Sequence, residues 1–396
     1  MRRNAVLFVA ISLLSGFGST AMSLVAGIWI LDLTGSPSRA ALTGLCVYAP
    51  TLAGPWLGAL LDRVPRRPLL IATNLLLAAS LLSLLAVRTV AQSWLIFAVA
   101  LTYGISYVLL DAGESALLPV ALPAGALGDV NGWRSSAQEG TKLVAPLAGA
   151  GLYAWHGGAA VAVLSAAMPV IAAVLYAALR LTAAPATTTN VAPGPGLRAG
   201  LAVLAGHGLL RVTVTLAAVS IAVSGFATAA QYEVVTVGLG LAATFLGVLV
   251  SAQGAGSVVG GLIVGRLIAR RGVTAVGVAG TALFAIGLVA RCLPWWPALL
   301  VGAVIGGIGL PWTLTAAVTA VQTHTPPDRL GRVAATANTV MFGPTALAIP
   351  LGAVAVHLGA RPVLLAGAAL CLAAAATVAR RSRHRPPAGA TVHIGR

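Results

Sequence analysis

Long runs of apolar residues, separated by short polar breaks, dominate the hydrophobic pattern of this chain. Most runs reach the ~20 mainly apolar residues that a helix needs to cross the hydrocarbon core of a bilayer. The strands of a β-barrel would instead alternate apolar and polar residues over short segments. The pattern predicts an all-α integral membrane protein with twelve spanning helices, near residues 5–31, 40–61, 69–87, 94–118, 132–155, 159–181, 209–234, 242–268, 273–293, 297–321, 333–357 and 363–379.

Composition excludes a soluble globular protein. Hydrophobic residues make up 59% of the 396 residues and charged residues only 8%, whereas a soluble domain carries about 25% charged residues. Such a chain cannot cover itself with a water-compatible surface. The three cysteines (Cys46, Cys292 and Cys371) lie within or at the edge of predicted spans and form no CxxC pair, so we expect neither a disulfide framework nor a metal site.

The net charge of +16 is a topology signal rather than a sign of nucleic-acid binding. If Arg2 and Arg3 are cytoplasmic, 19 arginines fall on the cytoplasmic side and four on the other, which is the positive-inside bias. We therefore predict a multi-pass protein of the cell (cytoplasmic) membrane with both termini cytoplasmic and no nucleic-acid partner. The basic tail, residues 383–396, is expected to lie against anionic headgroups of the lipid bilayer.

A polar stretch at residues 183–208 divides the chain into two halves of six predicted spans. It predicts a central cytoplasmic linker with a short amphipathic piece at Leu197–Leu204. The halves match at an offset of 203 residues: six of the eleven glycines in 44–151 find a glycine partner, where composition alone predicts roughly two. We therefore predict a parallel repeat of two six-helix bundles, residues 1–182 and 209–382.

A cluster of charges fills the break between the second and third predicted spans. The stretch "GALLDRVPRRPLL" (58–70) sets Asp62 directly before Arg63, with two more arginines close behind. Its partner in the second half is "GLIVGRLIARRG" (261–272), in which Gly265 replaces the aspartate. The Asp62 carboxylate can accept hydrogen bonds from a nearby arginine or from free N–H groups at a helix N-terminus.

The motif G-x-x-x-D-R-x-x-R-R resembles the signature loop of the major facilitator superfamily. The stretches "ALLPVALPAGALGDVNGWRSSAQEGTKLVAPLAGAGL" (116–152) and "LGVLVSAQGAGSVVGGLIVGRL" (246–267) resemble the fourth-to-fifth and eighth spans of its twelve-helix drug:proton antiporter branch, which includes macrolide and siderophore exporters. The resemblance covers nearly the whole chain. It implies the major facilitator fold, a monomer, and a cavity lined by spans 1, 4, 7 and 10.

For the charge cluster, the resemblance implies a conformational latch between the bundles, made in the outward-facing state and broken in the inward-facing one. Pro65 stands where the family often has glycine, and the second copy lacks the aspartate, so any latch is one-sided. The alternative is that the arginines only anchor the topology. The latch candidates are Gly58, Asp62, Arg63, Arg66, Arg67, Arg266 and Arg270.

Ionisable residues also occur in the fourth and fifth predicted spans, where they are costly and need partners. Tyr103, Tyr107 and Asp111 follow one another at intervals of four residues, and Glu114 comes three residues later. Helical spacing sets all four on one stripe, which we expect to face the bundle interior. The fifth span begins with Arg134, Glu139 and Lys142, the last two in the favourable acid-first order for an i,i+3 pair.

Three carboxylates and two cations leave one carboxylate without a partner, and burial then favours its protonated form. Asp111 lies deepest and is the first candidate for a proton carrier; Glu114 is the second. The same groups could instead form a static network or bind a cationic substrate directly. The candidates for the proton or substrate path are Asp111, Glu114, Glu139, Lys142, Arg134, Tyr103 and Tyr107.

Asp32 and Glu233 occupy near-equivalent positions at the outer ends of the first and seventh predicted spans. They are candidates for an outer gate or for attracting cations. Solvated helix ends are the alternative.

Together these patterns predict a secondary active transporter that couples proton movement to efflux of small lipophilic or amphiphilic compounds by alternating access. Proton-coupled uptake of a small metabolite and a non-transporting membrane sensor are the alternatives. The chain has no GK[ST] phosphate loop, no HExxH and no nucleophile elbow with partners, so we expect no enzyme. No cofactor is expected beyond the proton motive force, and the expected partner is a small-molecule substrate.

Overall fold

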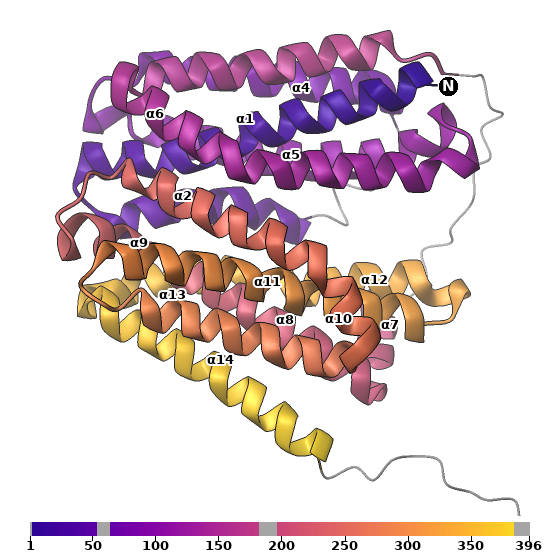
Figure 1. Cartoon of the computed structure of the whole chain (residues 1–396). Helices are drawn as coiled ribbons and strands as arrows, with labels where there is room; N and C mark the ends of the chain where they lie inside the picture. Colours follow the sequence, from indigo (N-terminus) through magenta and orange to yellow (C-terminus); the bar gives the residue numbers. More distant parts are fainter. Residues whose placement is uncertain (1, 54–63, 182–195, 384–396) are drawn as a thin grey trace, which may run out of the picture.

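The computed structural model describes residues 2–53, 64–181 and 196–383 (Figure 1), and the fold is given for these residues. They are almost entirely helical and contain no β-strand. Helices are the expected outcome for such apolar segments, because lipid offers no hydrogen bonds and each segment must pair its own backbone groups.

The described part of the first half contains five α-helices and three short 3₁₀ segments. They are α1 (Arg2–Thr34), α2 (Pro37–Tyr48) with its continuation η1 (Ala49–Ala53), α4 (Arg66–Ser83) followed by η2 (Leu84–Ala86) and η3 (Val90–Gln92), α5 (Trp94–Ala121) and α6 (Ala124–Ala178).

The second half begins after the linker with α7 (Gly196–Gly206). It continues with α8 (Gly208–Phe226), α9 (Thr228–Glu233), the π-helical turn η4 (Val234–Gly238), α10 (Phe245–Ala290), α11 (Trp296–His324), α12 (Pro327–Phe342), α13 (Thr345–Ala355) and α14 (Ala360–Arg383).

Nine helical segments in the described part of the chain are long and apolar enough to span a membrane. Two of them, α6 with 55 residues and α10 with 46, would be about 70–80 Å long if straight, more than twice the ~30 Å hydrocarbon core. Each reverses at a glycine with left-handed backbone, Gly157 (φ 73°) and Gly272 (φ 79°), and so provides two spans. The second predicted span is described only as far as Ala53. The described residues thus form the all-helical, many-span membrane architecture expected from the sequence.

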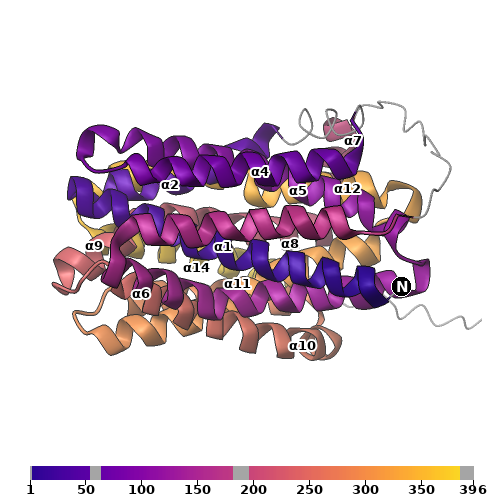
Figure 2. The ribbon, with the colours of Figure 1, turned by 90° about the horizontal axis from the view of Figure 1, so that it is seen from above.

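All long helices run between two faces of the molecule, as Figure 1 and the view from above in Figure 2 both show. We call one end the linker face, because α1 begins there, α6 and α14 end there, and the short α7 lies there. The opposite end is called the far face, where α1 ends and where α10, α11 and α14 begin. The amphipathic piece expected in the linker is part of α7, and its Leu204 is buried against the second bundle.

Three clusters of buried apolar side chains hold the helices together, and one of them is shared by both bundles. The shared cluster lies toward the far face and joins residues such as Ile30 of α1 to Val235 of η4. Toward the linker face, the first bundle has its own cluster around Phe8, and the second bundle has another around Leu210. The bundles are thus joined at the far face and have separate cores at the linker face.

Close backbone contacts between α6 and α10 connect the bundles. A Cβ atom added to Gly247 would lie 2.4 Å from Cβ of Ala150, and one added to Gly254 would lie 2.6 Å from the carbonyl oxygen of Lys142. Glycines permit this approach because they present no side chain to the opposing helix. On the other side of the molecule, α2 contacts α13, where the Ser38 hydroxyl donates to the Ala353 carbonyl (2.7 Å).

Substituting Gly254 tests the contact between the bundles. We expect Gly254→Ala to destabilise the protein by about 1–3 kcal/mol, because the added methyl group would meet backbone atoms that cannot turn aside. Gly261→Ala, on the same helix and with no atom within 4 Å of the added Cβ, is the matched control. It should be neutral or slightly stabilising, since alanine favours helix. Thermal unfolding of the purified variants measures the effect. Equal shifts of the unfolding temperature in Gly254→Ala and Gly261→Ala would contradict a close contact at Gly254.

Candidate functional site

The ionisable residues of α5 and α6 form two ion pairs and leave one carboxylate alone. Glu114 of α5 pairs with Arg134 of α6, and both side chains are largely buried. Nζ of Lys142 lies 2.5 Å from Oε1 of Glu139, and these two side chains are nearly half exposed. Asp111 is exposed and makes neither a hydrogen bond nor an ion pair within the described residues.

Further polar side chains surround the Glu114–Arg134 pair. Nε of Arg134 donates to Oγ of Ser12 on α1 (2.9 Å), and Nη1 donates to Oδ1 of Asn131 (3.3 Å). Tyr176, in the second arm of α6, interacts electrostatically with the Glu114 carboxylate. The pair therefore ties α1 to α5 and both arms of α6, in surroundings where an unpartnered charge would be strongly unfavourable.

A row of polar side chains continues from this pair along α5. Asp111 lies within electrostatic range of Arg134 and, one turn away, of Tyr107. Tyr107 is 56% exposed and also lies near Tyr48 of α2. Tyr103, another turn along, is partly buried in the shared far-face core. Of the stripe expected to face the bundle interior, Glu114 is buried and Tyr103 partly buried, whereas Tyr107 and Asp111 are exposed.

Glu139 connects this cluster to the second bundle. Its Oε2 accepts a hydrogen bond from Oγ of Ser257 on α10 (3.3 Å). The contact lies one helical turn from Gly254, where the backbones of α6 and α10 meet. Because the two helices belong to different bundles, any movement of one bundle against the other must change this hydrogen bond.

The charge cluster after the second predicted span is only partly described. Gly58, Asp62 and Arg63 lie outside the described residues, so the expected latch stays a prediction. Arg67, at the start of α4, donates to the carbonyl of Ala177 at the end of α6, which is a contact within the first bundle.

The remaining arginines of the latch proposal lie at the linker face. Arg66 is an exposed residue at the first position of α4. Arg266 and Arg270 are exposed on α10, shortly before its reversal at Gly272.

The two outer-gate candidates are each bonded within their own bundle at the far face. Oδ2 of Asp32 accepts from the Tyr153 hydroxyl (2.8 Å), which joins α1 to α6. Oε1 of Glu233 accepts from the backbone N–H of Ala360 (3.1 Å), which caps the first turn of α14. In this conformation each carboxylate thus stabilises one bundle.

The sequence interpretation did not predict the contacts that two residues make between the bundles. One is Ser257, the partner of Glu139. The other is Tyr232 on α9, whose hydroxyl lies so close to α1 that a Cβ atom added to Gly27 would be 1.8 Å away from it. A lone serine and a lone tyrosine in apolar runs give no sequence signal for such contacts, which depend on how two distant segments meet.

Taken together, these observations describe a two-bundle, all-helical membrane protein with ionisable residues gathered along α5 and α6. The family model of the Major Facilitator Superfamily matches this chain at residues 6–229 and again at residues 212–394. The chain belongs to that superfamily.

Individual relatives are more distant. Macrolide efflux protein A of Streptococcus pyogenes is 29% identical over 180 residues, which is 43% of this chain and 42% of that protein. The match therefore spans less than half of the relative. Solved structures of a nucleoside transporter (TM-score 0.72, 13% identity, 95% of this chain and 99% of that one) and of a D-xylose–proton symporter (TM-score 0.73, 13% identity, 94% and 96%) share the fold.

Removing one partner of the buried ion pair should destabilise the protein far more than breaking the exposed pair. We expect Arg134→Met to lower the free energy of unfolding by about 3–5 kcal/mol, because Glu114 is left buried and alone. Lys142→Met, which breaks the half-exposed pair with Glu139, should change it by no more than about 1 kcal/mol.

The single variant Glu114→Leu and the double variant Arg134→Met with Glu114→Leu complete the cycle, and the double variant should recover much of the stability lost in Arg134→Met. Denaturation of the purified variants in detergent measures each value. Additive effects of the two substitutions would contradict the coupling of Glu114 to Arg134.

Proposed function

We propose that this chain is a proton-coupled exporter of small lipophilic or amphiphilic compounds, with Asp111 as the proton carrier. Membership of the superfamily provides transport across a membrane by movement of two bundles. The observation that carries the proposal is that Asp111 makes no hydrogen bond or ion pair within the described residues. Its neighbours Glu114 and Glu139 are each paired with a cation, while Asp111 is exposed and electrostatically close to Arg134.

The proposed proton cycle follows from the two charge states of Asp111. When ionised, Asp111 adds a second negative charge near Arg134 and competes with Glu114 for it. When protonated, it leaves the guanidinium to Glu114 and removes a charge from the polar row. Because Arg134 also reaches Ser12 on α1, this change alters the contact between α1, α5 and α6. Glu139 and Ser257 then transmit movement of α6 to the second bundle.

In this proposal the linker face is cytoplasmic and the conformation is inward-facing. The excess of arginines at that face supports the orientation. The joined cores at the far face and the separate cores at the linker face support the conformational state. Asp111 then releases its proton to the cytoplasm as the substrate binds, and it is protonated again from the opposite side after the bundles have moved.

Export is favoured over uptake by the partial match to a macrolide efflux protein. Proton-coupled uptake of a small metabolite is the second candidate, favoured by the fold that this chain shares with a D-xylose–proton symporter. A non-transporting sensor would move no solute at all. We further propose that the protein works as a monomer in the cytoplasmic membrane and needs no cofactor beyond the proton motive force.

Proton movement in energised everted vesicles tests the proposed function. Addition of a transported compound from a panel of macrolides and amphiphiles should dissipate the proton gradient in wild-type vesicles. Asp111→Asn should abolish this response, because an amide cannot exchange a proton. Asp129→Asn, an exposed carboxylate near the start of α6, is the control and should respond like the wild type.

The outcomes separate the competing proposals. An equal response of wild type and Asp111→Asn would remove Asp111 from the proton path and leave antiport standing. Compound-driven proton entry in right-side-out vesicles, with no response in everted ones, would favour uptake. No response to any compound in either preparation would contradict the exporter proposal.

The orientation is tested separately by cysteine labelling of intact cells. In a variant lacking Cys46, Cys292 and Cys371, a membrane-impermeant maleimide should label Arg39→Cys at the far face. It should label Arg270→Cys at the linker face only after the cells are opened. Both side chains are exposed, so accessibility depends on the side of the membrane. The reverse labelling pattern would contradict a cytoplasmic linker face.

A further inference from the structure

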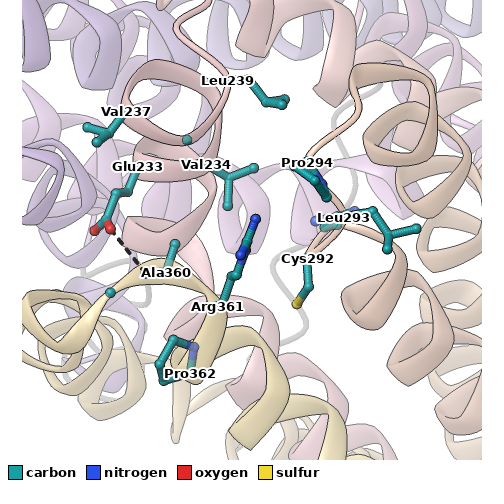
Figure 3. A pocket seen from close by; sticks show the side chains of 13 residues that line it. Glu233, Val234, Val237, Leu239, Cys292, Leu293, Pro294, Ala360, Arg361 and Pro362 are labelled. Atoms are coloured by element: carbon teal, nitrogen blue, oxygen red, sulfur yellow. Dashed lines mark hydrogen bonds between the residues drawn. The ribbon is translucent and has the colours of Figure 1, made fainter.

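A cavity of about 280 Å³ lies at the far face of the second bundle, at the opposite end of the helices from the Glu114–Arg134 pair. It is open to one side and is lined by η4, the turn that follows α10, and the start of α14 (Figure 3). Apolar side chains such as Val234 and Leu239 form part of its wall. Its charged lining residues are Glu233, Arg291 and Arg361.

Arg291 is a buried cation with too few partners. Arg291, in the turn after α10, is only 1% exposed, and its Nη2 donates to Oε1 of Gln253 in the first arm of α10 (3.0 Å). Nε and Nη1 are shielded from solvent and have no acceptor among the described residues. Neither of the two ion pairs in the described chain includes Arg291. A guanidinium buried in this state is strongly unfavourable unless an acceptor completes its hydrogen bonds.

The carboxylate that lines the cavity is already engaged elsewhere. Oε1 of Glu233 accepts from the N–H of Ala360, the contact marked by the dashed line in Figure 3. The same figure shows Arg361 extending from α14 toward the space between Val234 and Cys292. Arg361 has no hydrogen bond or ion pair with another described residue. Arg361 thus borders the cavity without an acidic partner, and the one carboxylate there caps a helix. Arg291 contributes to the wall as a residue, while its guanidinium lies deeper, against Gln253 and Gly306.

We propose that this cavity binds an anionic oxygen group, a phosphate or a carboxylate, between Arg361 and Arg291. Guanidiniums suit these groups because their parallel N–H donors match two oxygens at once. Arg361, the exposed partner, meets the anion first. The guanidinium of Arg291 then turns toward the cavity and gives Nε and Nη1 the acceptor they lack. The oxygens belong either to a small soluble anion or to the headgroup of an anionic lipid.

Anion-dependent stability tests the proposal without any measurement of transport. A ligand that binds the folded protein raises its unfolding temperature. One arm titrates detergent-purified protein with inorganic phosphate against chloride at equal ionic strength. The other arm compares nanodiscs of phosphatidylglycerol with nanodiscs of phosphatidylcholine. Intrinsic tryptophan fluorescence reports unfolding in both arms, because Trp295 and Trp296 come directly after the cavity residues Leu293 and Pro294.

We expect one arm to stabilise the wild type, and we expect Arg361→Gln and Arg291→Gln to weaken the apparent affinity at least about tenfold. Arg88→Gln is the matched control, because Arg88 is an exposed arginine at the repeat-equivalent position of the first bundle. It should bind like the wild type. If Arg291→Gln does not fold, the exposed Arg361→Gln carries the comparison.

The two arms distinguish a small soluble anion from an anionic lipid headgroup. Stabilisation by phosphate in detergent identifies a soluble anion, and stabilisation by phosphatidylglycerol alone identifies a lipid headgroup. No stabilisation in either arm would overturn the proposal. So would an effect of equal size in the wild type and both cavity variants.

Discussion

Lipid offers no hydrogen bonds, so every backbone and charged group in this structure must find a partner within the protein. Each long apolar run is therefore a helix, and the two longest runs turn back at glycines, Gly157 and Gly272. Because lipid is as apolar as the helix surfaces, helices associate through close contact rather than through exclusion of water. The same constraint sorts the ionisable side chains into pairs, so that the unpaired Asp111 and the under-partnered Arg291 stand out.

Much of the fold was open to prediction from the sequence, because membrane helices are specified by local composition. The described helices confirm the predicted spans apart from the second, which is described only as far as Ala53, and they include the divisions of α6 and α10 near residues 157 and 272. The Glu139–Lys142 pair was also accessible, since residues three apart on a helix are neighbours. Which carboxylate, Asp111 or Glu114, pairs with Arg134 could not be predicted from the sequence. The pairing depends on the angle at which α5 meets α6 and on the position of Ser12.

Contacts between the bundles were beyond sequence reasoning for a different reason. Ser257 and Glu139 are more than a hundred positions apart, and no pattern of either segment specifies the register in which α6 meets α10. The repeat was also an incomplete guide, since Arg88 is exposed while its counterpart Arg291 is fully buried. Equivalent positions in a duplicated fold share a backbone location, but their surroundings are set by the opposite bundle and by the loops.

The arrangement of three cores, one shared at the far face and two separate at the linker face, has a thermodynamic consequence for the proposed transport cycle. Separating the bundles at the far face exposes part of the shared apolar core, so its packing sets the free-energy difference between the two conformations. A change of about 1.4 kcal/mol in that difference alters the ratio of the two populations tenfold. The apparent affinity on either side of the membrane is the intrinsic affinity scaled by the population of the state open to that side. Residues such as Ile30 and Val235, far along the helices from the Glu114–Arg134 pair, can therefore tune which side of the membrane the protein serves best.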